Sequence, residues 1–349
     1  MSAVLLAALL FCASCSSESL FGSAAINGGD SQPTTGAVTG FSSALTESEN
    51  TGTHGESGIG ETEDHSGSAN KTLTGNLPGS IYDENTAVVV NTAVDVYYYQ
   101  DKTSTRITQL LFNQPVEVLE EDDQWVRLRL EDGTVGWSRI RNIDWDWTCL
   151  EQTRYLGKIV VTGKEKQIYS HPRNGIVVRD VGMGTELFVH SKSDNVYEVA
   201  LPGNLIGWIS ENGTFQLNTD EAIKKTDAKI FAQSCEKFRG TSYLQGGVSF
   251  QGIDGAGILY VAMKVNGVEL PHDLRGQFAL GEEVNPADIE IGDVLFFSST
   301  GEGNDLANAG VYTGDGMFIQ ASQHAGKVQY TEMSDPYYQQ RLKGIKRYF

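Results

Sequence analysis

An internal repeat constrains the fold of this chain more than any other feature of its sequence. Residues 124–137 align with residues 195–208, and each segment reads as an alternating strand, a turn with Gly or Asn, and a second strand that ends in Gly-Trp. Val96-Tyr97 and Ile168-Tyr169 match at a similar offset of about seventy residues. Such a period fits one small domain per repeat. The sequence therefore predicts two small all-β barrels, over residues 85–150 and 151–218.

The tryptophans all lie between Trp125 and Trp208. We expect Trp137 and Trp208, which end the two aligned segments, to fill the barrel cores. Trp145 and Trp147 alternate with acidic residues, which is typical of a strand with one aromatic face. A second interpretation of this pair is an aromatic wall against the next domain.

Residues 219–349 have a different pattern. Apolar residues recur at three- and four-residue steps from Asp220 to Phe238, which predicts a helix with Asp220 and Glu221 near its N-terminus. The apolar segment 257–265 predicts a second helix, and strands are predicted at residues 294–297, 309–312, 317–320 and 328–330. Helices followed by an antiparallel sheet indicate an α+β domain.

The first 84 residues do not have the pattern of a folded domain. An apolar run from Ala3 to Phe11 leads to Cys12-Ala13-Ser14-Cys15, which resembles a bacterial lipobox. Residues 1–15 would then be a lipoprotein signal peptide, with Cys15 lipidated and the chain anchored to a membrane. A soluble protein with a chance apolar start is the alternative. Residues 16–84 are rich in Gly, Ser, Thr and acids and predict a disordered tether.

The net charge bears on the class of partner, and the two remaining cysteines bear on whether the chain has a disulfide. The formal net charge of -19 at pH 7 argues against a nucleic-acid partner, because phosphate binding needs clustered Lys and Arg. In an exported protein, Cys149 and Cys235 could form a disulfide, and two separate buried thiols fit equally well.

The stretch from Gly252 to Leu259 has the form of a catalytic element: a Gly-bounded turn, Asp254, a step of small residues and then an apolar helix. A papain-like cysteine hydrolase places its thiol at such a helix N-terminus, where the dipole stabilises the thiolate, and its histidine on the following sheet. Here the position of the thiol is Gly255.

Several motifs in order carry a resemblance to a known family. They are Gly240-Thr241-Ser242-Tyr243-Leu244-Gln245-Gly246-Gly247, Leu270-Pro271 with Gln277, Ile291-Gly292-Asp293-Val294-Leu295-Phe296-Phe297, Ala309-Gly310-Val311-Tyr312, and Asp335-Pro336-Tyr337-Tyr338. Residues 219–349 resemble the NlpC-type cell-wall cysteine peptidases, which have a papain-like fold, and the two repeats resemble bacterial SH3-like domains. The resemblance implies cleavage of γ-D-glutamyl-diamino acid bonds in peptidoglycan stem peptides.

The chain departs from the family pattern at the catalytic positions. The family writes Asp-Cys-Ser-Gly where this chain has Asp254-Gly255-Ala256-Gly257. Asn308 stands at the position of the histidine, and Gln320 at that of the third polar residue. Tyr243 and Asp254 match positions that line the family's cleft, so we expect them, with Asn308 and Gln320, to bind substrate. Asp254 is also expected to cap the helix from Gly255.

These losses predict a catalytically inactive pseudoenzyme that binds stem peptides or an envelope partner protein, exported and held in the cell envelope. One alternative is an active peptidase with a non-standard nucleophile, for which Cys235 is the nearest thiol in sequence. Another is a scaffold or adhesin with no cleft ligand. We expect His272 and His324 to be solvated loop residues, and the sequence predicts neither a metal site nor a cofactor.

Overall fold

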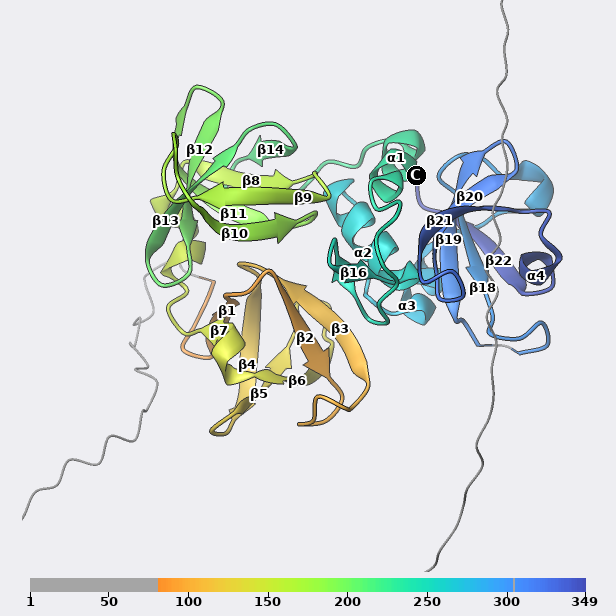
Figure 1. Ribbon diagram of the computed structural model, residues 1–349, viewed down its shortest axis with the longest axis horizontal. Coiled ribbons are helices and arrows are strands. Elements are labelled where there is room, and N and C mark those ends of the chain that lie inside the picture. Colours follow the sequence, from red (N-terminus) through yellow and green to blue (C-terminus); the bar gives the residue numbers. More distant parts are fainter. Residues whose placement is uncertain (1–80, 304) are drawn as a thin grey trace, which may run out of the picture. The chain divides into compact units, whose positions relative to one another are not determined.

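The computed structural model describes residues 81–303 and 305–349 (Figure 1). The predicted signal peptide, the lipidation site Cys15 and nearly all of the predicted tether lie outside the described residues. The described part is mostly sheet, with four α-helices. None of its helices is long and apolar enough to cross a membrane.

The first sheet has seven strands in the order β3-β2-β6-β5-β4-β1-β7. Its strands are β1 (Thr86–Val89), β2 (Ala93–Tyr97), β3 (Arg106–Leu111), β4 (Pro115–Glu121), β5 (Trp125–Arg129), β6 (Val135–Arg139) and β7 (Ile143–Asp144). Alternating apolar residues such as Val94, Val96 and Val126 form its core. Short 3-10 turns, among them Thr148–Leu150, lead to the next sheet.

The second sheet repeats the first strand for strand. Its order is β10-β9-β13-β12-β11-β8-β14, which is the order of the first sheet with seven added to each number. The strands are β8 (Gly157–Val161), β9 (Glu165–Tyr169), β10 (Val177–Gly182), β11 (Glu186–Ser193), β12 (Val196–Leu201), β13 (Leu205–Ser210) and β14 (Thr214–Leu217). Tyr97 pairs with Trp137 as Tyr169 pairs with Trp208. The internal repeat is therefore confirmed in strand order; that the sheets close into barrels stays a prediction.

The prediction that Trp137 and Trp208 fill the cores of the two repeats is wrong. Trp137 and Trp208 are only half-buried, because the neighbouring glycine of each Gly-Trp pair faces the core. A Cβ on Gly136 would lie 2.5 Å from Val96 Cγ1, and one on Gly207 would lie 2.4 Å from Ile168 Cγ2. Since side chains alternate along a strand, the tryptophans point to the other face. Of the pair Trp145 and Trp147, Trp147 is buried against Phe188 and Ala200 of the second sheet. Trp145 packs against the core of the first sheet, so an aromatic wall against the next domain fits Trp147 alone.

The rest of the described chain combines helices with a six-stranded antiparallel sheet in the order β17-β22-β18-β19-β20-β21. Its strands are β17 (Glu282–Glu283), β18 (Val294–Phe297), β19 (Asn308–Gly314), β20 (Met317–Ser322), β21 (Lys327–Glu332) and β22 (Leu342–Arg347). The helices are α1 (Ala228–Glu236), α2 (Gly255–Val265), α3 (Leu274–Leu280) and α4 (Pro336–Gln339), and β15 (Val248–Ser249) pairs with β16 (Gly252–Ile253). The four predicted strands are confirmed.

Two details of this region differ from expectation. The first helix begins at Ala228 rather than near Asp220, because Asp227 caps it by accepting a hydrogen bond from the Ile230 amide. Helix α3 and strand β22 were not predicted, since short segments give weak periodicity.

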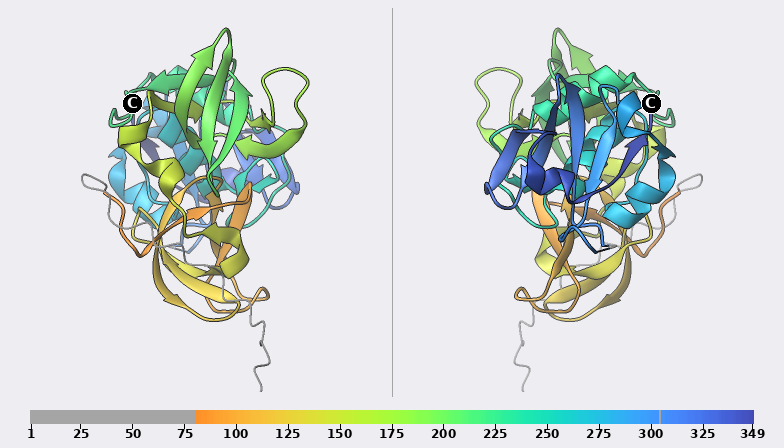
Figure 2. Two further views of the ribbon diagram at one scale, coloured as in Figure 1. Left: turned by 90° about the vertical axis from the view of Figure 1, so that its left-hand side faces the viewer. Right: turned by 90° about the vertical axis from the view of Figure 1, so that its right-hand side faces the viewer.

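Apolar side chains cover both faces of this sheet. Val311 and Ile319 pack against α1 and α2, and this cluster also takes in Leu111 of β3, Val160 of β8 and Met183, which follows β10. The short helix α4 lies on the opposite face (Figures 1 and 2). Its Tyr338 packs against Phe297 and Phe318. Cys149 and Cys235 are both free and buried, so they form no disulfide with each other.

Candidate functional site

The N-terminus of α2 is the centre of the candidate site. The Asp254 side chain caps the helix as predicted, accepting hydrogen bonds from the Gly257 amide at 2.8 Å and from the Gly246 amide at 2.6 Å. The first turn of a helix leaves backbone amides without helical acceptors and carries the positive end of the dipole. The small residues are needed here, because a Cβ on Gly257 would lie 2.0 Å from the Gly247 carbonyl oxygen.

A chain of neutral polar side chains faces this terminus from the sheet. Asn308 Nδ2 donates to Gln320 Oε1 at 2.6 Å, and Gln320 Nε2 donates to Thr331 Oγ1 at 2.9 Å. The three residues come from β19, β20 and β21, and Gln320 is fully buried. A Cβ on Gly255 would lie 2.4 Å from Asn308 Oδ1, so the amide occupies the space next to the glycine. The structure thus brings Gly255, Asn308 and Gln320 together.

Tyr243 lies beside the same helix end. It forms a bridge with Ile253, and its amide donates to the Gly326 carbonyl. The ring is half-buried, and burial, together with the nearby Asp254 carboxylate, raises the pKa of the phenol. The predicted pair Tyr243 and Asp254 is therefore adjacent in space, on the helix side of the site.

The first sheet holds the loop that precedes the helix. Arg106 Nη1 donates to the Gln245 carbonyl at 2.9 Å, and the Val248 amide donates to Gln109 Oε1 at 3.2 Å. Asp95 accepts from both Arg106 Nε, at 2.6 Å, and Gln109 Nε2, at 2.9 Å. No local pattern predicts these contacts, which join residues 139 positions apart.

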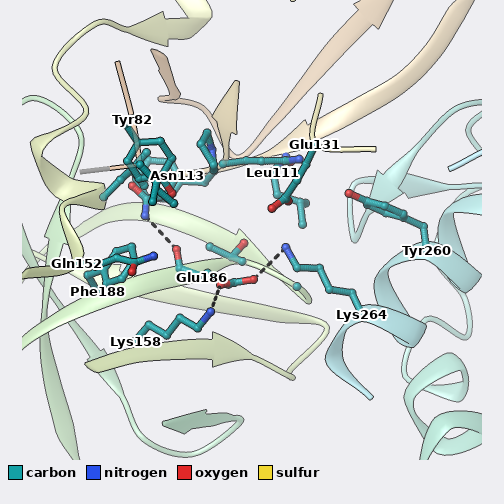
Figure 3. Close-up of a pocket in the computed structure, with 17 residues that line it drawn as sticks. Tyr82, Leu111, Asn113, Glu131, Gln152, Lys158, Glu186, Phe188, Tyr260 and Lys264 are labelled. Carbon is teal, nitrogen blue, oxygen red and sulfur yellow. Dashed lines mark hydrogen bonds and ion pairs between the residues drawn. The ribbon is translucent and has the colours of Figure 1, made fainter. Parts of the chain in front are cut away.

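The second sheet holds the other end of α2. Lys264 Nζ lies 3.0 Å from Glu186 Oε1, and Lys158 Nζ lies 3.1 Å from Glu186 Oε2 (Figure 3). Burial alone would lower the pKa of Lys264, but the Glu186 carboxylate reverses this and raises it. Burial would likewise raise the pKa of Glu186, and the two lysines lower it. The second sheet therefore contacts α2 itself, and the first sheet contacts the segment that precedes it.

The described thiols do not take part in this site. Cys235, on α1, is fully buried, and burial raises the pKa of its thiol well above the usual value. Cys149 is also buried and raised in pKa by burial. Neither thiol is accessible as a nucleophile, so Cys235 does not fit the role considered for it.

The two candidate histidines differ. His324 is exposed, as expected, but His272 is buried, which corrects the expectation of a solvated residue. Its ring packs against Tyr260, and burial lowers its pKa, which favours the neutral imidazole. Within residues 81–303 and 305–349, no group of His, Cys, Asp and Glu could hold a metal ion.

Comparisons with known proteins bear on what this site does. Residues 240–347 match the NlpC/P60 family, and residues 99–140 match the bacterial dipeptidyl-peptidase Sh3 domain. The chain is 25% identical over 250 residues to a γ-D-glutamyl-L-lysine dipeptidyl-peptidase of Bacillus cereus, covering 69% of this chain and 74% of the relative. It is 31% identical over 120 residues to a probable endopeptidase of Haemophilus influenzae, covering 34% of this chain and 73% of that protein.

A solved structure agrees in fold. An NlpC/P60 family protein from Bacillus cereus superposes with a TM-score of 0.69 at 21% identity, over 75% of this chain and 99% of that one. A γ-DL-glutamyl hydrolase of Bacillus subtilis is 38% identical over 118 residues, although the match spans only 28% of its length and 33% of this chain.

These relatives correct one expectation from the sequence. The prediction that the chain is not an enzyme is wrong, because the matching proteins are named as peptidases and hydrolases and point to an enzyme. The substitutions at Gly255, Asn308 and Gln320 are therefore differences in the site to be explained within an enzyme family. The order of motifs, the fold and the relatives agree: this chain belongs to the NlpC/P60 family.

Proposed function

We propose that this chain is a cell-wall peptidase that hydrolyses γ-D-glutamyl-diamino acid bonds in peptidoglycan stem peptides. The observation that carries the proposal is the capped N-terminus of α2 opposite Asn308, inside the segment that matches the family. A helix N-terminus stabilises the oxyanion that forms when a peptide carbonyl is attacked. The printed activities of the relatives support this bond as the target.

The nucleophile in this proposal is water. Gly255 has no side chain, and the described thiols are buried, which favours an attacking group from outside the chain. Water attacks the γ-carbonyl carbon and passes its proton to the Asp254 carboxylate, while the carbonyl electron pair moves to the oxygen at the helix terminus. When this intermediate collapses, the C–N bond breaks and the proton passes from Asp254 to the departing amine.

The other predicted residues hold the substrate in this proposal. Tyr243 lies beside Asp254, and Asn308 and Gln320 supply amide donors and acceptors. The domain from residue 219 would be papain-like, preceded by two SH3-like barrels over 85–150 and 151–218. A location in the cell envelope, with a lipid anchor on Cys15, would place the enzyme near its polymeric substrate.

The test follows release of the dipeptide L-Ala-γ-D-Glu from L-Ala-γ-D-Glu-L-Lys by mass spectrometry, with the full chain and two matched variants. Asp254→Asn can still accept from the Gly257 amide, but it removes the proton acceptor and the acceptor of the Gly246 amide, so we expect its rate to fall by about 10²- to 10⁴-fold. Asp273→Asn makes the same change at the cap of α3 and should leave the rate within about twofold of the original.

A third variant makes the outcome decisive. The double change Gly255→Cys with Asn308→His restores the thiol and imidazole of the family pattern. The proposal is wrong if the unmodified chain releases no dipeptide under conditions in which this double variant does.

A further inference from the structure

A cavity of about 160 Å³ lies where the two seven-stranded sheets meet α2 (Figure 3). Its walls come from the turn between β3 and β4, from β8 and β11 of the second sheet, and from α2. The residues that α2 contributes, Tyr260 and Lys264, lie beyond the first turn of that helix. This junction cavity is therefore separate from the site at the N-terminus of α2.

Two lysines of the lining share one carboxylate. Lys158 Nζ lies 3.1 Å from one oxygen of Glu186, and Lys264 Nζ lies 3.0 Å from the other. The side chains of Lys158 and Lys264 are still 16% and 24% exposed, and both line the cavity. An ammonium group has three donors and no acceptor, so each lysine keeps donors that Glu186 does not use. Both lysines can therefore donate to a second carboxylate in the cavity.

A buried hydroxyl adds a further donor to this side of the cavity. Thr185 precedes Glu186 in the chain, lines the cavity and is 1% exposed. Its Oγ1 has no hydrogen-bond partner within residues 81–303 and 305–349. Since leaving a buried hydroxyl unpaired is unfavourable, Thr185 favours an acceptor bound beside it.

The exposed side of the cavity carries a carboxylate. Glu131 is exposed and lies on the same side of the cavity as Lys264 (Figure 3). Burial would lower the pKa of Lys264, and the Glu186 and Glu131 carboxylates both raise it. In the part of the chain that the structure describes, Glu131 has no ion-pair partner within 4.0 Å. Its oxygens are therefore available to a cation.

The charges of the lining balance. Its charged residues are two lysines and two glutamates, so their formal charges sum to zero. An anion or a cation alone would leave one sign in excess in a partly buried place, whereas a zwitterion matches both signs. The remaining walls include the apolar side chains of Leu111, Phe112 and Phe188.

We propose that the junction cavity binds a free α-amino acid with an apolar side chain as its zwitterion. The carboxylate of the amino acid accepts from Lys158 and Lys264, and its ammonium group pairs with Glu131. Its side chain packs against Phe112 and Phe188. The inference goes beyond the proposed hydrolysis and does not depend on it, because the cavity lies away from Gly255.

The test measures binding to the full chain by calorimetry at pH 7. The ligands are L-leucine, N-acetyl-L-leucine, which lacks the ammonium group, and L-leucinamide, which lacks the carboxylate. We expect leucine to bind about tenfold more tightly than either analogue. In Glu131→Gln, the ratio of leucine to N-acetyl-leucine should fall to about one, while the ratio to leucinamide stays.

A second variant tests the other end of the ligand. Lys158→Met removes a donor to the carboxylate and should lower the ratio of leucine to leucinamide, with the ratio to N-acetyl-leucine kept. If Lys158→Met does not fold, Glu131→Gln decides alone, since that residue is exposed.

The control removes one carboxylate elsewhere on the same sheet. Glu121→Gln alters an exposed acid on β4 and should keep both tenfold ratios. The inference is overturned if millimolar leucine does not bind, if the three compounds bind equally, or if Glu131→Gln leaves both ratios unchanged. Tighter binding of N-acetyl-leucine than of leucine would overturn it as well, since the cavity would then take an anion.

Discussion

The two ends of α2 lie beside polar groups of different kinds. At the N-terminus, Asn308, Gln320 and Thr331 form a hydrogen-bonded chain without a charged group. At the other end, Lys264 pairs with Glu186, which also pairs with Lys158 (Figure 3). A neutral chain keeps its geometry at any pH, whereas an ion pair depends on both protonation states. The contrast teaches that the hydrogen bonds beside Gly255 do not depend on pH, whereas the ion pairs that join α2 to the second sheet do.

The largest effect is expected from placing a charge among the hydrogen-bonded side chains of Asn308, Gln320 and Thr331. Gln320→Glu puts a carboxyl group in a fully buried position, where burial raises its pKa. Below the unfolded pKa of about 4.3, the protonated acid can still donate to Thr331, so little stability is lost. As the pH rises above that value, the unfolded chain ionises first and stability falls, by about 4 kcal/mol at pH 8 for a shift of about three units.

Urea unfolding from pH 4 to pH 8 measures this effect. Gln323→Glu, in an exposed turn, is the control and should show no such slope. A flat profile for Gln320→Glu would mean that water reaches the buried position.

The second prediction removes one of the two lysines that pair with Glu186 at the C-terminal end of α2. Lys264→Met leaves Glu186 with Lys158 alone in a partly buried setting, and we expect a loss of about 3 kcal/mol in the free energy of unfolding at pH 7. Lys224→Met removes a largely exposed pair with Glu221 and should cost less than about 1 kcal/mol. Similar losses in the two variants would show that the junction is solvated like the surface.

The same pair gives a pH dependence of opposite sign to that of Gln320→Glu. The pKa of Glu186 is lowered in the folded chain, so its contribution is present above about pH 4.3 and is lost as the pH falls through the folded value. The pKa of Lys264 is raised, so its contribution is present below about pH 10.4 and is lost at higher pH. The Lys264→Met variant should therefore lose less stability than the original chain between pH 5 and pH 3.

The third prediction concerns the space beside Gly255. An added Cβ meets Asn308 Oδ1 at 2.4 Å and the backbone nitrogen of Ala309 at 2.9 Å, so Gly255→Ala should cost about 2 kcal/mol through overpacking. Adding Asn308→Ala removes the closer contact and should recover about half of that cost. Thermal unfolding of both single variants and the double variant measures the coupling, and strict additivity would contradict it.

The smallest effect is expected at Thr331, the last residue of the hydrogen-bonded series Asn308, Gln320 and Thr331. Thr331→Val keeps the shape of the side chain and leaves Gln320 Nε2 without its acceptor, at a cost of about 1 kcal/mol. Thr313→Val, where the hydroxyl donates to the Met317 carbonyl in a half-buried position, serves as a comparison and should cost less. Denaturation midpoints at constant slope give both values.

Much of the site could be predicted because it depends on local sequence. The cap Asp254, the start of α2 at Gly255 and the strands that carry Asn308 and Gln320 follow from short-range patterns and from motif order. The pseudoenzyme interpretation failed since the missing side chains were read without the relatives, which point to an enzyme.

Other features could not be predicted because they join distant parts of the chain. Nothing near Arg106 indicates that it donates to the Gln245 carbonyl, and nothing near Glu186 indicates that Lys264 is its partner. Even the outward position of Trp137 required the register of β2 and β6.

The sequence by itself determined the repeat, the order of helices and strands in the last third, and the residues at the N-terminus of α2, because backbone propensity and alternation act over a few residues. The tertiary structure alone decided that Asn308 fills the space beside Gly255 and that Gln320 is fully buried. It also decided that α2 is joined to the second sheet and the segment before α2 to the first. Those outcomes depend on packing and on charge pairing between segments far apart in the chain, which no local pattern encodes.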